Sequence, residues 1–543
     1  MKLLWIMSIG LLSLTSIIND TQAQSCGPRI RKDWDMLTAT EKTTYKNAIR
    51  AAMDSGDYIK FVEMHTEMRS EMEAHGQCIA RVASGACKSL GECMNITKEL
   101  GGWTKGVKRT LEINGVNNTG RCVTEPPLDR FCQLTSARGA ACARCVPRSD
   151  WSKVRVPATT SYASVRAQVF AGNDIGEMSP IVERGCHDDV HASLSGTMLW
   201  FASPADPIFW SHHSMVDALH TIFHKCRVGT QRLTFAQKAS NPVAWYSCSR
   251  RDNGTFRPTD EVTMRTGEMG VNPIPGWKDP KIGRYFAGVP NQYAGLMDVR
   301  DLGSSSYGYA LTGQLAAMYD QCDNSPTSRK LEETFAKNTT STSTMCGVPE
   351  ADGFDADGND YASQNNFPET DYTGKDDGHR DVIIVDNSGT PVPADATKDV
   401  YITEDSEKRV VDWYDQTIET MGGDTHDNMA DLERQACMFE HVCLGGTQDY
   451  SPEFKVIWNV KEPRCKIIVD AIINGSNSIT YAPWREVMET QFGCPKPINA
   501  TNTTSYSGSS SSSRLEDGSD YPTDEIRFTD VLPKIKTVSI VDN

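Results

Sequence analysis

The sequence lacks an excess of basic residues. Its 543 residues include 55 Lys and Arg against 71 Asp and Glu, which gives a formal net charge of −16 at pH 7. Because nucleic-acid binding depends on clustered Lys and Arg that displace phosphate counterions, this balance excludes nucleic acid as the expected partner and favours small molecules. Hydrophobic residues make up 38% of the chain, which is enough for packed cores and excludes a disordered acidic chain.

Long hydrophobic runs are missing after the amino terminus. Residues 1–23 contain Lys2, an apolar run from Leu3 to Ile18 and a short polar stretch that ends at Ala23. This order is typical of a secretory signal peptide, and the run is too short to span a bilayer comfortably. No later stretch approaches the ~18 apolar residues of a membrane helix. We therefore expect a secreted chain with no membrane span.

The 17 cysteines all follow that segment. In an oxidising compartment disulfides are their expected state, and an odd number leaves one cysteine over. Cys142 and Cys145 have no second pair that could complete a zinc site, so we expect them in disulfides too. After the predicted signal peptide, seven N-x-S/T sequons indicate a glycoprotein. They lie at Asn95, Asn117, Asn253, Asn338, Asn474, Asn499 and Asn502.

Hydrophobic periodicity predicts a mainly α fold. Thr38 and Glu41 form a capping-box pattern, and the helix that they open should end before Gly56. A second helix over 58–74 should carry His65. A cysteine-rich loop region follows at 78–148. Further helices are predicted at 162–170, 181–195 and 209–223.

The second half of the chain has a mixed pattern. Residues 406–421 and 428–440 favour helices, whereas 454–460 and 467–473 favour strands. The Ser- and Thr-rich end cannot bury apolar surface. We thus predict a signal peptide at 1–23, a core at 24–310, a mixed α/β C-terminal region at 311–497 and a low-complexity tail at 498–543.

Four of the 11 histidines lie within residues 187–213. On a helix, His187 and His191 differ by about 40° in azimuth and ~6 Å in rise, so both imidazoles can reach one metal ion. His213, near a helix start at Pro207, can complete a three-imidazole site that suits copper or zinc. Zinc hydrolases need a Glu after the first His, and the shorter Asp188 in that place disfavours them.

These residues resemble a known family. The run from Asp206 to Asp217, DPIFWSHHSMVD, with the upstream His-x3-His pair and the Ser-Gly-Thr-Met turn that begins at Ser195, resembles the second copper-binding motif of tyrosinases and catechol oxidases, relatives of molluscan haemocyanin. The Tyr307-Gly308-Tyr309 run resembles the element that closes their catalytic core. The likeness covers roughly residues 35–310.

The resemblance implies a four-helix-bundle core with a dicopper centre. Its second copper ion (CuB) would be held by His187, His191 and His213, with His212 as a neighbour that does not bind metal. Dioxygen and a small phenolic molecule would be the substrates.

The same resemblance assigns four further residues. Glu183 and Asp188 stand where the family places a water-orienting acid and an Asn, so that hydroxylation of monophenols is doubtful with Asp188. Phe201 corresponds to the bulky residue over CuB. Asp217 would orient the copper ligands from behind.

The first copper ion (CuA) needs three histidines, and only two are found. His65 and His75, the latter between Ala74 and Gly76, resemble the first two ligands. No histidine follows until His187, so the third ligand is missing. Three explanations stay open: a segment lost from the sequence at Cys78, a degenerate protein that keeps only CuB, or a remodelled site that recruits another histidine.

Two functions follow from the resemblance. The first is a secreted copper oxidoreductase that oxidises phenols or o-diphenols to o-quinones with dioxygen, inactive if the CuA half is truly incomplete. The alternative is a non-catalytic secreted glycoprotein that retains only the CuB half. A type 3 centre uses one electron from each of two Cu(I) ions, so the number of coppers separates the two.

Overall fold

The computed structural model describes residues 29–67, 89, 91, 94–246, 255–262, 264–323, 380–393 and 396–494. The predicted signal peptide, the predicted tail, His75 and the first part of the cysteine-rich region lie outside these residues.

The first helices follow the sequence prediction. Helix α1 (Ala39–Ser55) opens with the predicted capping box, in which Thr38 and Glu41 bind each other's backbone N–H groups, and ends at Gly56 in the left-handed conformation with φ 76°. Helix α2 (Tyr58–Glu67) carries His65 in its last turn. Short helix α5 (Asn95–Glu99) follows within the cysteine-rich region.

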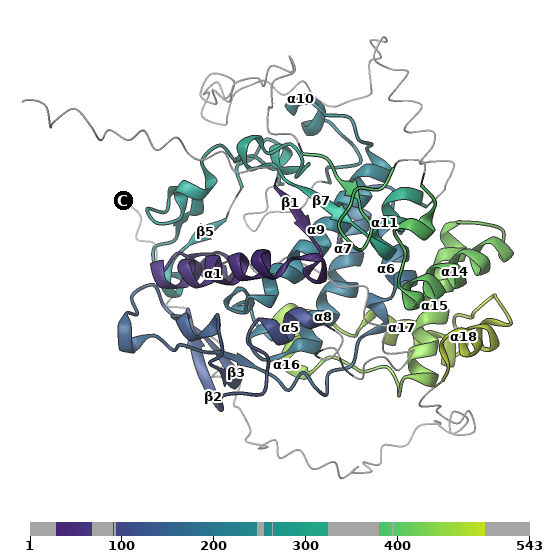
Figure 1. The fold of residues 1–543 in the computed structure, drawn as a ribbon, viewed down its shortest axis with the longest axis horizontal. Helices are drawn as coiled ribbons and strands as arrows, with labels where there is room; N and C mark the ends of the chain where they lie inside the picture. Colours follow the sequence, from purple (N-terminus) through teal and green to yellow (C-terminus); the bar gives the residue numbers. More distant parts are fainter. Residues whose placement is uncertain are drawn as a thin grey trace, which may run out of the picture. The chain divides into compact units, whose positions relative to one another are not determined.

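Four helices make up the middle of the core (Figure 1). They are α6 (Tyr162–Val169), α7 (Ile175–Val182), α8 (Asp188–Leu194) and α9 (Ile208–Arg227). A π-helical turn, η5 (Glu183–His187), joins α7 to α8. At Gly185 in this turn a side chain would collide with the Gln168 amide, which lies 2.1 Å from the position of a Cβ atom. The remaining core helices are α10 (Phe235–Ala239) and α11 (Gly313–Gln321).

Small sheets flank these helices. The parallel sheet has the order β1-β7-β8, formed by Ile30–Lys32, Gly308–Leu311 and Ile383–Ile384. The antiparallel sheet has the order β2-β3-β4, formed by Val107–Ile113, Val116–Val123 and Val146–Arg148. Strands β5 (Arg265–Thr266) and β6 (Ile274–Pro275) form a two-stranded ladder.

The C-terminal helices correct two predictions. They are α14 (Asp405–Thr420), α15 (His426–Cys443), α16 (Pro452–Trp458), α17 (Arg464–Ile473) and α18 (Trp484–Phe492). The predicted helices at 406–421 and 428–440 are confirmed, but the predicted strands at 454–460 and 467–473 are wrong. Ser451 caps α16, which has Pro452 at its first position, and Pro463 precedes α17. These helix-start signals favour a helix where the period of a short apolar run fits both a helix and a strand.

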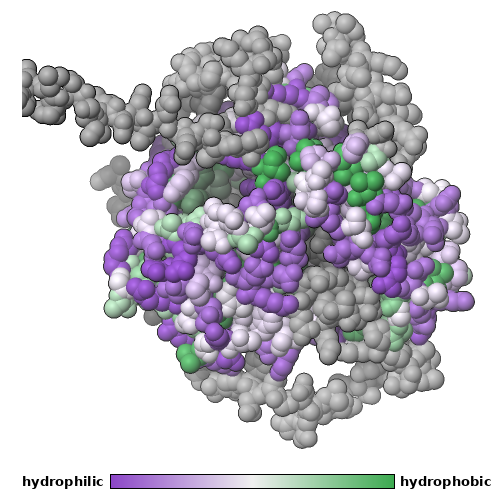
Figure 2. All heavy atoms as spheres, in the orientation of Figure 1, coloured by the Kyte–Doolittle hydropathy of each residue, from purple (hydrophilic) through white to green (hydrophobic). Residues whose placement is uncertain are grey.

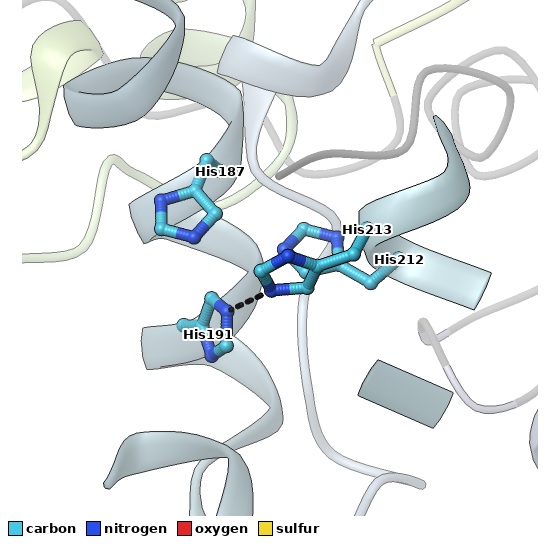
Figure 3. A group of neighbouring side chains, drawn as sticks. All are labelled: His187, His191, His212 and His213. Atoms are coloured by element: carbon cyan, nitrogen blue, oxygen red, sulfur yellow. Dashed lines mark hydrogen bonds between the residues drawn. The ribbon is translucent and has the colours of Figure 1, made fainter. Parts of the chain in front are cut away.

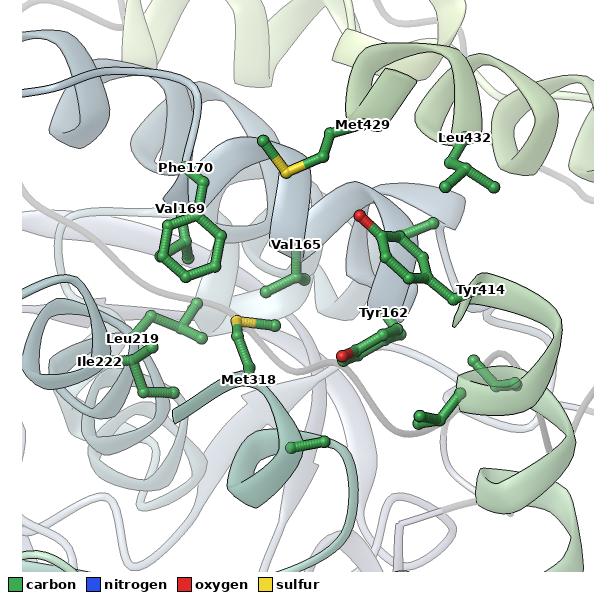
Figure 4. Packing of buried hydrophobic residues seen from close by; sticks show 14 of the residues in the cluster. Tyr162, Val165, Val169, Phe170, Leu219, Ile222, Met318, Tyr414, Met429 and Leu432 are labelled. Carbon is green, nitrogen blue, oxygen red and sulfur yellow. The ribbon is translucent and has the colours of Figure 1, made fainter. Parts of the chain in front are cut away.

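Helices from both parts of the chain share one hydrophobic cluster (Figure 4). Val165 of α6, Leu219 of α9 and Met318 of α11 belong to the same buried cluster as Tyr414 of α14 and Leu432 of α15. The face in Figure 2 is mainly hydrophilic, and no helix in the described ranges is long and apolar enough to cross a membrane.

Five disulfides confirm the expected oxidised state for ten of the eleven described cysteines, and the buried Cys186 takes part in none of these five. They join Cys122 to Cys145, Cys132 to Cys142, Cys226 to Cys322, Cys437 to Cys465, and Cys443 to Cys494.

Candidate metal centre

Four imidazoles from two helices meet in the core (Figure 3). His187 ends the π-helical turn and His191 lies one turn later on α8, while His212 and His213 lie in the first half of α9. One ring nitrogen from each lies within 4.8 Å of the others. His187, His191 and His212 are buried, and His213 is half-buried. The structure thus brings together the three predicted CuB ligands, and His212 with them.

Backbone carbonyls orient three imidazoles. His191 Nδ1 lies 2.7 Å from the Met198 carbonyl, and His65 Nδ1 lies 2.7 Å from the Phe201 carbonyl. His187 Nδ1 lies 3.1 Å from the Glu183 carbonyl. Because a carbonyl can only accept, each Nδ1 carries the proton, and each Nε2 keeps a lone pair for a metal ion.

The Nε2 atoms fit a metal site. His187 Nε2 is buried and has no hydrogen-bond partner among the described residues. His191 and His213 Nε2 lie 3.4 Å apart, the separation of two nitrogen ligands at ~2.0 Å from one tetrahedral ion. Burial lowers the pKa of His187 and His191 well below the usual value, so both are neutral, as metal binding requires. The donor set fits copper or zinc.

A sharp turn supplies two of the carbonyls. Ser195 and Gly196 have φ of 50° and 58°, a left-handed pair after α8 that leads into the short 3-10 helices Gly196–Leu199 and Ser203–Ala205. A Cβ atom at Gly196 would lie 2.9 Å from the backbone of Arg148 in β4. Only glycine therefore lets this turn pack closely enough on the sheet to present the Met198 and Phe201 carbonyls.

A buried ion pair fixes the start of α9. The Arg148 guanidinium donates to both carboxylate oxygens of Asp206, at 2.7 and 2.6 Å, and to the carbonyls of Leu100 and Gly102. Asp206 also accepts from the Ile208 N–H at 3.1 Å. Asp206 was not predicted as a site residue, although an Asp before Pro207 at a helix start is a recognisable capping signal.

Of the two predicted CuA ligands, His65 belongs to the described residues. Its ring lies 4.9 Å from that of Phe209 and 6.1 Å from that of His213, centroid to centroid. His75, the second predicted ligand, lies outside the described residues. The structure thus places one predicted CuA ligand next to the four-imidazole cluster.

The two predicted acids lie beside His187. Asp188 is buried, its Oδ1 lies 2.8 Å from His187 Nδ1, and burial raises its pKa to about 8. Burial, and secondarily the Asp188 charge, also raises the pKa of the Glu183 carboxyl. Both groups are therefore poised to exchange protons at higher pH than an ordinary carboxyl.

The other two predicted residues, Phe201 and Asp217, have different surroundings. The Phe201 ring is 6.1 Å from the ring of His65. The Asp217 carboxylate accepts from Tyr307 at 2.8 Å, from Arg31 at 3.2 Å and from Tyr309. Its hydrogen bonds thus tie α9 to the β1-β7 sheet through the predicted Tyr-x-Tyr element.

Trp458 of α16 was missed by sequence reasoning. Its ring lies 4.9 Å from that of His191, 5.7 Å from that of His187 and 5.1 Å from that of Phe201. The residue lies in a segment predicted as a strand, and no motif connects it with the histidines.

Comparison with known proteins identifies the region that holds the site. Residues 34–225 match the family model described as the common central domain of tyrosinase. A stretch of 140 residues is 35% identical to Tyrosinase P of Aspergillus terreus, and the same match is found with Tyrosinase P of Aspergillus terreus strain NIH 2624 / FGSC A1156. It covers 24% of this chain and 35% of each relative, so the match spans about a third of the length of these relatives. No solved structure matches the chain.

Proposed function

We propose that the chain is a copper-dependent oxidoreductase of the tyrosinase family, on the premise that residues 34–225 match the central domain of that family. The proposed reaction is the oxidation of phenols or o-diphenols to o-quinones with dioxygen. Each o-diphenol gives up two electrons and two protons, and two turnovers reduce one dioxygen molecule to water.

One observation carries this proposal: the imidazoles of His187, His191 and His213 converge, with His191 and His213 Nε2 3.4 Å apart and His187 and His191 kept neutral by burial. These residues would hold the CuB ion, and copper when bound would supply the electron transfer between phenol and dioxygen. Three imidazole nitrogens are a donor set that copper accepts.

The surrounding residues would handle protons and orientation. Glu183, with its raised pKa, would accept a proton from the phenolic hydroxyl. Asp188 binds the Nδ1–H of His187 and holds the ring in its orientation. Because Asp188 replaces the Asn of the family, we propose o-diphenols rather than monophenols as substrates.

A non-catalytic protein with one copper is the second candidate. One sequence fact favours it: no histidine lies between His75 and His187, so a third ligand for a first copper ion is missing there. In this case the copper ion held by the CuB half would stabilise the fold or help to bind another molecule. Secretion and glycosylation belong to both candidates, and the five disulfides support secretion.

Copper counting combined with oxygen uptake tests the two candidates. The purified secreted chain is loaded with Cu(I), and copper per chain and oxygen consumption with catechol are measured, with His191→Ala as the control. Two coppers with uptake that the control loses support the oxidase. One copper without uptake contradicts it and supports the non-catalytic protein. Zinc in place of copper in the protein as purified would contradict both.

A further inference from the structure

Four partly exposed side chains surround the buried histidines. His187, His191 and His212 are buried, whereas His65, His213, Phe201 and Trp458 are half-buried. Within the described part of the chain, a small molecule that approaches the cluster therefore meets these four groups. Three of them belong to the matched central domain, and Trp458 comes from the C-terminal region.

The Trp458 ring faces two of the predicted CuB ligands, His187 at the end of η5 and His191 on α8. It is tilted by 40° against His191 at 4.9 Å and stands edge-on to His187 at 5.7 Å. It also lies at 34° to the Phe201 ring, 5.1 Å away. The two aromatic rings form a continuous apolar surface beside the imidazoles.

Local contacts hold Trp458 in this position. Its Nε1–H donates to the Leu199 carbonyl at 2.8 Å, in the same turn that orients His191. Its ring stacks on Phe454 at 5.5 Å, which is fully buried and packs on Tyr450. The Tyr450 hydroxyl donates to the Asp189 carboxylate on α8. Helix α16 is thus bound to the helix that carries His191.

Two disulfides close the segment covalently. Cys437 and Cys465, 28 residues apart, lie before and after α16, and Cys443 is joined to Cys494. A chain cut between Gln448 and Asp449, both exposed, would leave the later fragment attached through both bonds. The segment that carries Trp458 is therefore fastened covalently to α15 on either side of such a cut.

We propose that Trp458 is a specificity-determining residue, a fixed aromatic wall that limits the space beside the CuB histidines to single-ring phenols with small substituents. This inference rests on the proposed function for its substrates. An apolar wall of this kind packs against a phenol ring and excludes bulky ring substituents on the side of His187 and His191.

The first test uses fluorescence and needs no turnover. Cu²⁺ quenches a nearby indole, so the emission that Trp458 contributes, obtained as wild type minus Trp458→Phe, should be largely lost when one equivalent of Cu²⁺ binds. The emission of Trp484, half-buried on α18 and obtained through Trp484→Phe, should be far less quenched. Equal quenching of the two would overturn the placement of Trp458 beside the metal.

The second test uses substrate preference. Trp458→Ala should raise kcat/KM for 4-tert-butylcatechol relative to catechol by about 10-fold, the size of effect that a changed apolar pocket contact gives. Trp458→Phe should keep most of the preference, and Trp484→Ala all of it. An unchanged ratio in Trp458→Ala, with copper content intact, overturns the proposal.

The third test asks whether the segment with Trp458 is a permanent wall of the site or a cover that must be removed before the site is active. A specific protease site is inserted between Gln448 and Asp449 and cut under non-reducing conditions. Activity and substrate preference should stay as before the cut, and a rise in activity on cutting would overturn the fixed wall. If no variant turns over catechol but Trp458 emission is still selectively quenched, the oxidase proposal fails while the position of Trp458 beside the metal stands.

Discussion

The second histidine half of the site (His187, His191 and His213) and His65, the described member of the first histidine half, are held in different ways. In the second half, two of three rings are oriented by backbone carbonyls, and both supporting helices are tied to their neighbours. In the first half, only His65 belongs to the described residues, and its ring is held by the Phe201 carbonyl.

The difference shows what a metal site needs besides ligands. Residues 183–206 contain a π-helical turn, a left-handed turn and a helix start, and each one directs a specific imidazole or fixes its helix. These supports belong to the second histidine half, and even His65 depends on the same turn through Phe201. The second histidine half should therefore bind a metal ion without the first.

The largest effect is expected from breaking the ion pair that anchors α9. Arg148→Met leaves the Asp206 carboxylate buried without its partner, which should cost about 3–5 kcal/mol of unfolding free energy. Urea denaturation measures it, with the exposed Lys153→Met as a control expected to change stability by less than ~1 kcal/mol. The double variant Arg148→Met, Asp206→Leu should recover part of the loss. A loss no larger than that of the control would contradict the anchoring role.

The two halves can be compared directly by metal affinity. His191→Ala should lower copper affinity of the second histidine half by more than ~100-fold, beyond the 10–100-fold effect of losing an outer partner. His65→Ala should leave that affinity nearly unchanged, as should His220→Ala on the same helix as His213. Isothermal titration with Cu²⁺ in a weak competitor measures all three. Equal losses in His65→Ala and His191→Ala would show that the halves act as one unit.

A smaller loss of copper affinity is expected when Asp188 is substituted. Asp188→Ala removes the oxygen that binds His187 Nδ1–H at 2.8 Å and should lower copper affinity by about 10-fold. Asp188→Asn keeps an acceptor oxygen and should stay within about threefold of wild type, since hydrogen-bonded orientation of the ring is retained. The same titration applies. If the Asn variant loses as much as the Ala variant, the charge of Asp188 matters rather than its hydrogen bond.

A separate effect concerns the pH dependence of stability in the C-terminal region. Burial raises the pKa of Glu440 on α15 to about 8, whereas an unfolded Glu titrates near 4.3. The folded state thus keeps a proton that the unfolded state releases, so this contribution to stability is full below about pH 4 and is lost as pH rises to about 8. Glu440→Gln should flatten the fall in melting temperature between pH 5 and 8. An unchanged slope would contradict a protonated Glu440.

Much of this fold could be predicted from the sequence because several of the signals that specify it are local. The capping box at Thr38, the periodicity of α6 and α9 and the His-x3-His pair each lie within a few residues, and the structure has those elements. Helices α16 and α17 were predicted as strands because their short apolar runs fit both the helical and the strand period. The prolines at the start of each segment favour a helix. Trp458 could not be found, since its contact with His191 depends on tertiary packing.

The central claim is that His187, His191 and His213 hold one copper ion between α8 and α9. Pulsed electron paramagnetic resonance on the chain loaded with one equivalent of Cu²⁺ tests it most directly. We predict imidazole-nitrogen couplings that are lost in both His191→Ala and His213→Ala and retained in His65→Ala. Couplings that persist in either of the first two variants would contradict the account.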